Sequence, residues 1–345
     1  MLDVIAGKKA QKILAESGFK QELFSSFLGA SGGPKWFTLF ELDKYVFGDF
    51  FKDRQTKLNL VGSSAGAFRS ACFSQNDPVA AISRLAKSYS ETVYSDKPDR
   101  KEITTKAREV LDYMVSETGV EEIINNPVFK THLLVNKTNG FAASENKVFQ
   151  ALGLVKSIAL NRLDRKMIRS QYDRFVYKSP TSNLTIDDYC QFDTHYIDLT
   201  KENLKEALLA SGSIPYVMEG IKDIPGSPKG MYRDGGIVDY HFDFKFHDHD
   251  GLILYPHFNP EPKAGWFDKK LKRQVKPENY DNIVMLVPSR EFIESLPYSK
   301  IPDRTDFTTM EADERIRYWK TVLSETRRLS DAFDDLINQS TRPVI

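Results

Sequence analysis

Hydrophobic and polar residues in the first seventy positions alternate in a way that predicts strands and helices in turn. Apolar runs at 23–28 and 58–61 are short, as expected of buried strands. Between them, a glycine-rich turn at 29–33 precedes an aromatic-rich stretch at 36–47 that is expected to be helical. A further helix is expected from Ala65. This order of strand, glycine loop, helix, strand, sharp turn and helix is typical of a parallel sheet covered by helices.

The remainder of the chain continues the same pattern less regularly. Residues 77–175 are predicted to be mostly helical, with one strand at 132–135. The charged, amphipathic stretch at 310–338 predicts a helix or a helix pair, and residues 1–18 predict an amphipathic helix. Short apolar runs predict further buried strands at 196–199, 252–255 and 283–287.

These elements predict an α/β fold with a central, mostly parallel or mixed sheet, covered by helices and followed by a C-terminal helical segment at about 305–340. No stretch is rich enough in Pro, Gly or Ser to divide the chain, so a single domain over residues 1–345 is expected. Residues 256–276 are predicted to be a long surface excursion.

Composition narrows the class of protein. The 48 Lys and Arg residues equal the 48 Asp and Glu residues, so no overall charge attracts the chain to nucleic acid. The two cysteines are too few for a disulfide framework. No continuous apolar stretch predicts a signal peptide or a membrane span, and a cytoplasmic protein is expected, with peripheral membrane contact as a further hypothesis.

The sharpest chemical signal is the pentapeptide Gly62-Ser63-Ser64-Ala65-Gly66, a GxSxG sequence. It lies between a predicted strand and a predicted helix, as a nucleophile elbow requires. Small residues on both sides permit the strained turn, and the helix N-terminus places N–H groups near developing negative charge. A tight turn without a catalytic role is the alternative interpretation.

A second signal is the glycine-rich loop at 29–35, whose bare backbone could direct N–H donors at an oxyanion or a phosphate. It is not a P-loop, because Pro34 and Trp36 occupy positions where that motif needs glycine and a hydroxyl residue. It also lacks the GxGxxG spacing of a dinucleotide loop. A plain strand-to-helix turn remains the alternative.

A third signal is Asp234, which two glycines, Gly235 and Gly236, follow directly. The glycines would let the backbone approach another segment while the carboxylate points forward. Asp-Gly is also a common turn dipeptide, so this signal is weak by itself.

Together, and in this order, the three segments resemble those of the patatin-like lipid acyl hydrolases. The segment at 207–215 is similar to that family's ASxAxP-type sequence, and the resemblance covers about 23–243. It implies a three-layer α/β fold, a Ser–Asp dyad without histidine, and no cofactor or metal. The implied nucleophile is Ser64 and the implied base is Asp234. The implied oxyanion hole consists of the N–H groups of Gly32, Gly33 and Ala65. The supporting motif positions are Gly62, Gly66, Lys35, Gly235 and Gly236.

The resemblance implies a patatin-like phospholipase A, lysophospholipase or esterase that acts on lipid esters through an acyl-enzyme. The sequence departs from the family pattern in the glycine loop, where Ser31, Lys35 and Trp36 replace a glycine, an arginine and a glycine. Lysine keeps the positive charge without the forked guanidinium. A catalytically inactive lipid-binding or scaffold protein of the same fold is therefore the alternative.

The dyad makes a physical demand on Asp234. An ordinary aspartate, with a pKa of about 3.9, is a poor base for a serine hydroxyl. Partial burial would raise its pKa, and direct contact with the hydroxyl is required. We therefore predict that the Asp234 carboxylate hydrogen-bonds to Ser64 Oγ with no histidine between them.

Two histidine-based alternatives follow from the residues. A Ser–His–Asp triad could use His241, but the chain has no histidine after His257, where such a residue usually lies. The sequence His247-Asp248-His249-Asp250 could bind a metal, although a polar turn before the next strand fits it better. No metal requirement is predicted.

Aromatic and basic residues occur together at 266–273. On a protein without net charge, such a run is a candidate site for binding anionic lipid headgroups at a membrane surface. The alternative interpretation is an ordinary solvated surface. The residues of this predicted membrane contact are Trp266, Phe267, Lys269, Lys270, Lys272 and Arg273.

Overall fold

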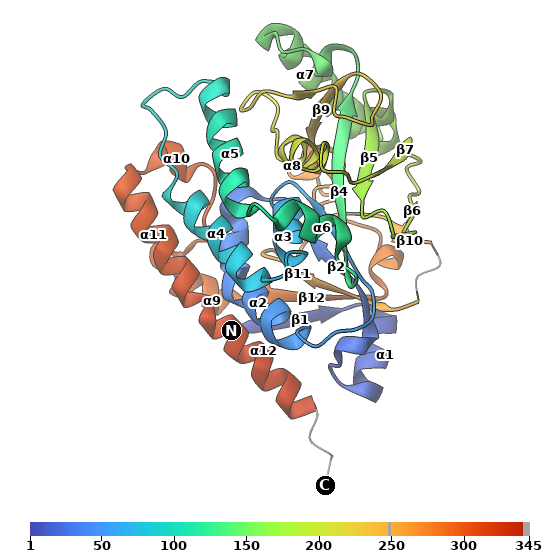
Figure 1. The fold of residues 1–345 in the computed structure, drawn as a ribbon, viewed down its shortest axis with the longest axis vertical. Helices are drawn as coiled ribbons and strands as arrows, with labels where there is room; N and C mark the ends of the chain where they lie inside the picture. Colours follow the sequence, from blue (N-terminus) through green and yellow to red (C-terminus); the bar gives the residue numbers. More distant parts are fainter. Residues whose placement is uncertain (248–249, 341–345) are drawn as a thin grey trace.

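The protein is built around one ten-stranded sheet, described here from a computed structural model of residues 1–247 and 250–340 (Figure 1). Asp248 and His249 of the predicted polar turn lie outside these described residues. The strand order is β1-β12-β11-β2-β3-β4-β5-β7, with β9 paired to β4 and β8 paired to β9. The strands of this sheet are β1 (Leu2–Ala6), β2 (Phe24–Gly29), β3 (Leu58–Ser63), β4 (Phe129–Thr138), β5 (Tyr172–Lys178), β7 (Thr194–Asp198), β8 (Ile221–Lys222), β9 (Met231–Asp234), β11 (Leu252–Pro256) and β12 (Ile283–Pro288).

The sheet is mixed and mostly parallel, as predicted. Strands β12, β11, β2, β3 and β4 form a continuous parallel run. The edge strand β1 is antiparallel to β12, and β5 and β9 are both antiparallel to β4, whereas β7 is parallel to β5. A separate two-stranded ribbon pairs β6 (Ile186–Asp187) with β10 (Lys245–Phe246). Because β9 pairs with β4, the end of β9 is brought next to the end of β3.

Helices cover the sheet, and the C-terminal helices run along one edge of the molecule (Figure 1). Helix α3 lies on β3 and β4, and α4 lies over α3. The predicted C-terminal helical segment is present as a helix pair, α11 and α12, after the short α10. The helices are α1 (Lys8–Ser17), α2 (Phe40–Tyr45), α3 (Ala65–Phe73), α4 (Pro78–Glu91), α5 (Arg100–Met114), α6 (Gly119–Asn125), α7 (Lys147–Leu163), α8 (Leu204–Ser211), α9 (Arg290–Ser295), α10 (Asp306–Thr309), α11 (Ala312–Glu325) and α12 (Arg327–Ser340).

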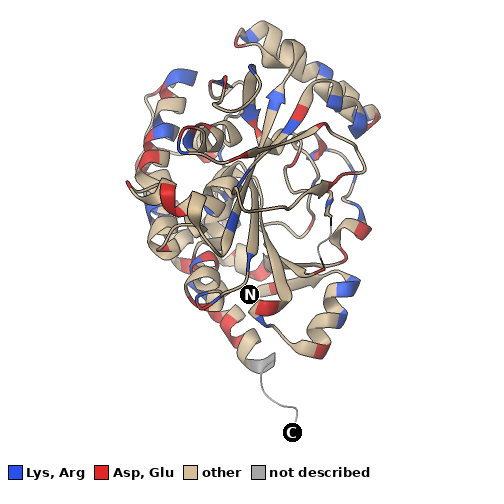
Figure 2. Cartoon of the chain, turned by 45° about the vertical axis from the view of Figure 1, so that its right-hand side comes forward, with Lys and Arg blue, Asp and Glu red and all other residues tan. Residues whose placement is uncertain are grey.

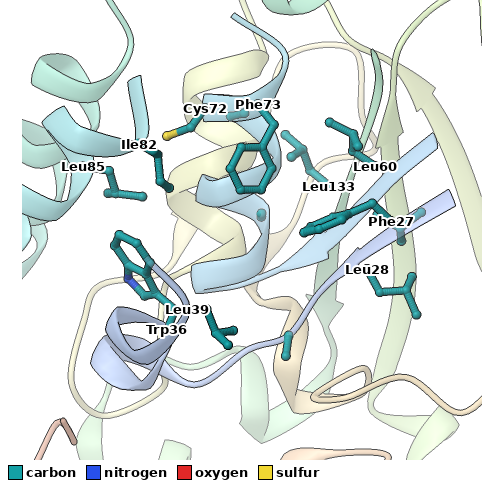
Figure 3. Close-up of a cluster of buried hydrophobic side chains, with 14 of the residues drawn as sticks. Phe27, Leu28, Trp36, Leu39, Leu60, Cys72, Phe73, Ile82, Leu85 and Leu133 are labelled. Carbon is teal, nitrogen blue, oxygen red and sulfur yellow. The ribbon is translucent and has the colours of Figure 1, made fainter. Parts of the chain in front are cut away.

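A core of aliphatic and aromatic side chains fixes α3 against the sheet (Figure 3). Phe27 from β2 and Phe73 from α3 meet edge to face, with ring centres 5.4 Å apart. Leu60 and Leu133, from β3 and β4, are fully buried in the same cluster. Burial of each such side chain stabilises the fold by roughly 1.5–3 kcal/mol. This packing holds rigidly the strand end where the GxSxG turn lies.

The prediction of one amphipathic helix over residues 1–18 is wrong at its beginning. Residues Leu2–Ala6 form the edge strand β1, which pairs antiparallel with β12, and only Lys8–Ser17 are helical. The break is at Gly7, where any side chain would overlap the backbone carbonyls of Tyr280 and Asp281. Five residues were too few for periodicity to distinguish strand from helix.

The prediction for residues 77–175 is also corrected. Strand β4 is ten residues long, and residues 172–175 belong to strand β5 rather than to a helix. The β5 sequence contains Arg174, which is buried in an ion pair with Asp239. Arg174 made the stretch look unlike a buried strand, because its partner Asp239 lies far away in the sequence.

Residues 256–276 are more than the predicted surface excursion. Ala264 and Gly265 are buried, and the Ala264 carbonyl accepts a hydrogen bond of 2.8 Å from the N–H of Tyr240. The segment thus packs against the loop that follows Asp234. Among the helices of the described residues, none combines the length and apolarity that crossing a bilayer requires.

Candidate active site

Ser64 occupies a strained turn between β3 and α3, as the GxSxG sequence predicts. Its φ of 52° and ψ of −126° lie in a region that residues with a side chain rarely adopt. The turn is tight because Gly66 lies against the backbone of Gly29 in the neighbouring strand. A Cβ atom at Gly66 would overlap the Gly29 carbonyl, and one at Gly62 would overlap the Gly66 carbonyl. The two motif glycines are therefore required by the close approach of three backbone segments.

Ser64 contacts Asp234 directly. The Ser64 hydroxyl donates a hydrogen bond of 2.9 Å to Asp234 Oδ2, so the predicted contact is confirmed. Both residues are buried, with 7% and 6% of their surface exposed. The contact joins residues 170 positions apart, and the pairing of β9 with β4 brings them together.

The second carboxylate oxygen of Asp234 is also held. Asp234 Oδ1 accepts a hydrogen bond of 2.7 Å from the N–H of Gly236. Gly235 lies so close to β4 that a Cβ atom there would overlap the Leu134 carbonyl. These contacts explain why two glycines follow the aspartate. They also hold the carboxylate in the orientation that points Oδ2 at Ser64.

Burial raises the pKa of Asp234 to about 6. The hydrogen bonds from Gly236 and Ser64 oppose this effect, as do the charges of Lys269 and Arg304, but burial is the largest cause. The carboxylate is consequently a stronger base than an ordinary aspartate and is still mostly ionised at neutral pH.

Two polar residues for which no role was predicted hold the dyad in place, although Ser211 lies within the segment at 207–215. Ser211, at the end of α8, accepts a hydrogen bond of 2.9 Å from the Ser64 N–H and donates one of 2.7 Å to the Leu134 carbonyl. Asn136 in β4 donates to the carbonyls of Asp234 and Gly235, at 2.8 and 3.0 Å. Asn136 directly follows the apolar run at 133–135, and this position carries no distinctive sequence signal for its role.

Ser31 connects the glycine loop to the elbow. Its hydroxyl lies 2.5 Å from Ser63 Oγ, and its N–H donates to the Tyr240 carbonyl at 3.0 Å. Ser63 Oγ in turn donates to the Asp239 carbonyl at 2.6 Å. The serine that replaces a glycine in the family pattern therefore fits the loop, because its hydroxyl bonds the residue before Ser64.

The predicted oxyanion donors lie at the same place. Gly32 and Gly33 line a small cavity of about 110 Å³ together with Ser64 and Asp234. Within residues 1–247 and 250–340, the N–H groups of Gly32 and Gly33 make no hydrogen bond. Gly33 has a φ of +56°, which glycine adopts without strain. Ala65 is the first residue of α3 and lines a larger cavity beside Ser64.

Three cationic side chains surround the small cavity. Lys35 is bound to Asp303 at 2.6 Å. Burial opposes ionisation of Asp303, but the hydrogen bonds from Lys35 and Thr305 lower its pKa to about 2. Lys35 is thus held by the segment before α10.

The other two cations, Lys269 and Arg304, have no carboxylate partner among the described residues. Lys269 keeps exposed surface, but its Nζ lies 3.9 Å from the centre of the Tyr240 ring. Removal from water, together with the charge of Arg304, lowers the pKa of Lys269 to about 8. Two unpaired positive groups therefore lie beside the Ser64–Asp234 pair.

His241, the candidate for a triad, does not bridge Ser64 and Asp234. Its ring is buried against His257, with ring centres 4.2 Å apart, and its Nδ1 accepts a hydrogen bond of 2.9 Å from the Lys263 N–H. Burial lowers the pKa of His241 well below its usual range, so the ring is neutral. It packs beside the site.

The larger cavity begins at Ser64 and has a volume of about 690 Å³, within the range of roughly 300–1,000 Å³ for small-molecule sites. It extends between α3, α4, α5 and the segment around α10. Apolar side chains dominate its wall, among them Phe68, Leu85, Ile103, Leu209, Val217 and Met218. Ser64, Gly33 and Arg304 line both cavities, so the two meet at the serine.

A mixed α/β sheet, a strained serine turn at the end of a parallel strand and a buried partner aspartate define an α/β protein with a nucleophile-elbow site. The sequence model described as patatin-like phospholipase matches residues 58–241, just over half of the chain. The chain belongs to the patatin-like phospholipase family, and this membership supports a lipid hydrolase. The match includes Ser64 and Asp234 but begins after the glycine loop at 29–35.

Remote likenesses to solved structures include the following two. VipD from Legionella pneumophila is 10% identical, with a TM-score of 0.37, and the match covers 90% of this chain and 67% of that one. The human GIVD cytosolic phospholipase A2 is also 10% identical, with a TM-score of 0.38, and the match covers 99% and 66%. The chain thus spans about two thirds of each. No curated protein matches the sequence.

Proposed function

We propose that this protein hydrolyses acyl esters of lipids, with Ser64 as the nucleophile and Asp234 as the only base. The observation that carries the proposal is the 2.9 Å hydrogen bond from Ser64 Oγ to a buried carboxylate whose pKa is raised to about 6. A base with that pKa is ionised at neutral pH and can accept the proton of an attacking hydroxyl.

The reaction would proceed through an acyl-enzyme. Ser64 Oγ forms a bond to the ester carbonyl carbon while its proton passes to Asp234 Oδ2. The bond to the leaving alcohol then breaks, and Asp234 returns the proton to that alcohol. Water repeats the sequence on the acyl-serine, which releases the fatty acid and restores both side chains.

The negative charge of the tetrahedral intermediate needs donors that are already in place. The unpaired N–H groups of Gly32 and Gly33 are the proposed donors, with the N–H of Ala65 at the first turn of α3. Since Ser64 precedes a nine-residue helix, the partial positive charge of that helix end favours the same oxyanion.

The two cavities indicate how a lipid would be bound. An acyl chain suits the larger, apolar cavity, and the scissile ester would then lie at Ser64, where the cavities meet. The polar remainder of the lipid would face Lys269 and Arg304 in the smaller cavity. Because these two cations have no carboxylate partner within residues 1–247 and 250–340, a phosphate-bearing headgroup is favoured over a neutral one.

Hydrolysis of a panel of p-nitrophenyl esters of increasing chain length tests this proposal, with Ser64→Ala as the blank. We expect turnover by the wild-type protein, rising from short to medium chains as the apolar cavity is filled. Turnover that is absent, or equal in Ser64→Ala, would refute the proposed function.

The headgroup preference makes a second prediction. Lys269→Met and Arg304→Met are each expected to lower kcat/KM for lysophosphatidylcholine by about tenfold, through loss of a charge-assisted contact. The value for monoacylglycerol with the same chain should stay within about twofold. Lys52→Met, which removes an exposed lysine that lines neither cavity, is the matched control. Equal losses on both substrates would contradict headgroup recognition by these cations.

The pH profile makes a third prediction. Since Asp234 must be ionised to act as a base, kcat/KM should fall tenfold per pH unit below an apparent pKa of about 6. The profile is measured on a soluble ester to avoid changes in lipid packing. An acidic limb near pH 4, the ordinary value for aspartate, would show that burial does not tune this group.

A further inference from the structure

Helix α7 exposes its large apolar side chains. In a helix that covers a core, such residues face inward, but on α7 they face outward along one stripe. Val148 is 66% exposed, Val155 62% and Leu163 76%. The members of the stripe on α7 are Val148, Phe149, Leu152, Val155, Ile158 and Leu163. Figure 1 shows α7 at the periphery of the molecule, with nothing over its outer side.

The fully buried residues of α7 are polar or small and several make hydrogen bonds, although Leu160 also packs against a buried apolar cluster. These buried residues of the helix are Gln150, Gly153, Ser157 and Asn161. Ser157 Oγ lies 2.8 Å from the Tyr172 hydroxyl, and Asn161 donates a hydrogen bond of 2.8 Å to Asp268. Rotating the helix to bury its apolar stripe would break these hydrogen bonds. The hydrogen bonds therefore stabilise the orientation in which the apolar stripe faces solvent.

The apolar surface continues beyond α7 toward the active site. Phe141 stacks on Phe149, with ring centres 5.5 Å apart. Tyr216 is 44% exposed, and its hydroxyl donates to the Lys147 carbonyl at 3.0 Å. Tyr216 directly follows Pro215, which lines the small cavity beside Ser64. The stripe and the site are thus connected by one short segment.

The charged residues on α7 itself are all basic. Helix α7 contains Lys147, Lys156 and Arg162 and no acidic residue. In Figure 2 the helix is mostly tan with blue positions. The segment at 266–273, the predicted membrane contact, lies against α7, because Arg273 donates to the Asn161 carbonyl at 2.8 Å. Its Lys270 is exposed, whereas its Trp266 and Phe267 are half-buried.

We propose that the outward face of α7 docks the protein on an anionic lipid surface, with its apolar stripe inserted among the acyl chains and its cations at the headgroups. This inference rests on the proposed function, because the surface supplies the substrate. An apolar stripe bordered by Lys and Arg is the pattern of helices that lie in the plane of a membrane interface. A second copy of the chain fits worse, since pairing of two such faces would bring the cations of both helices together.

Vesicle binding tests the proposal. Ser64→Ala is used as the background so that vesicles are not consumed, and vesicles contain phosphatidylcholine with or without about 30 mol% phosphatidylserine. Adding Leu152→Ser and Val155→Ser should weaken binding to the anionic vesicles at least about tenfold. Tyr113→Ser with Tyr298→Ser, which removes two exposed aromatic side chains elsewhere, is the matched control and should bind as the background does.

Turnover separates this proposal from the proposed function. With Ser64 restored, Leu152→Ser/Val155→Ser should cleave a soluble p-nitrophenyl ester normally but vesicle phospholipid at least about tenfold more slowly. Unchanged vesicle binding in the double variant would overturn the docking proposal, as would a change from dimer to monomer without an effect on vesicles. If no ester is cleaved but vesicle binding still depends on α7, the docking surface stands and the catalytic proposal fails.

Discussion

Replacement of Asp234 by asparagine is expected to reduce kcat at least about a thousandfold. Asparagine has nearly the same shape, so its oxygen can still accept from Gly236 and its amide can donate to Ser64 Oγ. The amide cannot take up the serine proton, however, and no other base contacts the hydroxyl among the described residues. The measurement is single-turnover acylation by a p-nitrophenyl ester.

The same variant should not be less stable than the wild type at pH 8. The folded-state pKa of Asp234, about 6, exceeds the unfolded value of about 3.9, so its contribution to stability is present below pH 4 and lost as the pH rises through 6. Asparagine does not ionise, and urea unfolding at pH 8 should give a free energy equal to or above that of the wild type. Activity within about tenfold of the wild type, in a folded protein, would mean that another group acts as the base.

Arg174→Met is expected to lower the free energy of unfolding by about 3–5 kcal/mol. Arg174 is buried in β5 and donates two hydrogen bonds, of 2.7 and 2.8 Å, to the carboxylate of Asp239. Removal of the guanidinium leaves the buried Asp239 carboxylate with only the more distant Arg165, 3.9 Å away, and removes the cation that lies 2.8 Å from Asp188. Because the Asp239 carbonyl also accepts a hydrogen bond from Ser63 Oγ, the substitution should also disturb the turn that carries Ser64.

The exposed pair of Arg290 and Glu294, 2.7 Å apart, provides the matched control for this variant. Arg290→Met removes the same kind of charge from a residue that is 90% exposed, and should leave the free energy of unfolding nearly unchanged, because solvent screens the pair. Urea unfolding of both variants decides the matter. If both variants lowered the free energy of unfolding by similar amounts, burial would not make the Arg174 ion pair more important for stability than an exposed pair.

Strong local patterns predicted the part of the fold that carries the site. The apolar runs at 58–61 and 283–287 are strands β3 and β12, because covered parallel strands are continuously apolar. The pattern failed where long-range pairing decides the structure. Residues Leu2–Ala6 pair with the edge of the sheet at β12, and the buried Arg174 of β5 is paired with Asp239 and Asp188.

The candidate site divides in the same way. Ser64 and Asp234 could be predicted because the glycines beside them mark tight backbone approaches that are visible in the sequence. The roles of Ser211 and Asn136 could not be predicted, since each acts through hydrogen bonds to segments far away in the chain. The outward orientation of the apolar stripe on α7 could not be predicted either. Periodicity detects an apolar stripe on a helix, but it does not show whether the stripe faces the core or the solvent.

Mass spectrometry of the protein after treatment with a fluorophosphonate tests the central claim most directly. The reagent phosphonylates an activated serine, so the adduct should be found on the peptide that contains Ser64. The account predicts rapid labelling of the wild type, labelling at least about a hundredfold slower in Asp234→Asn, and none in Ser64→Ala. An adduct on another serine, or equal labelling rates in the wild type and Asp234→Asn, would contradict it.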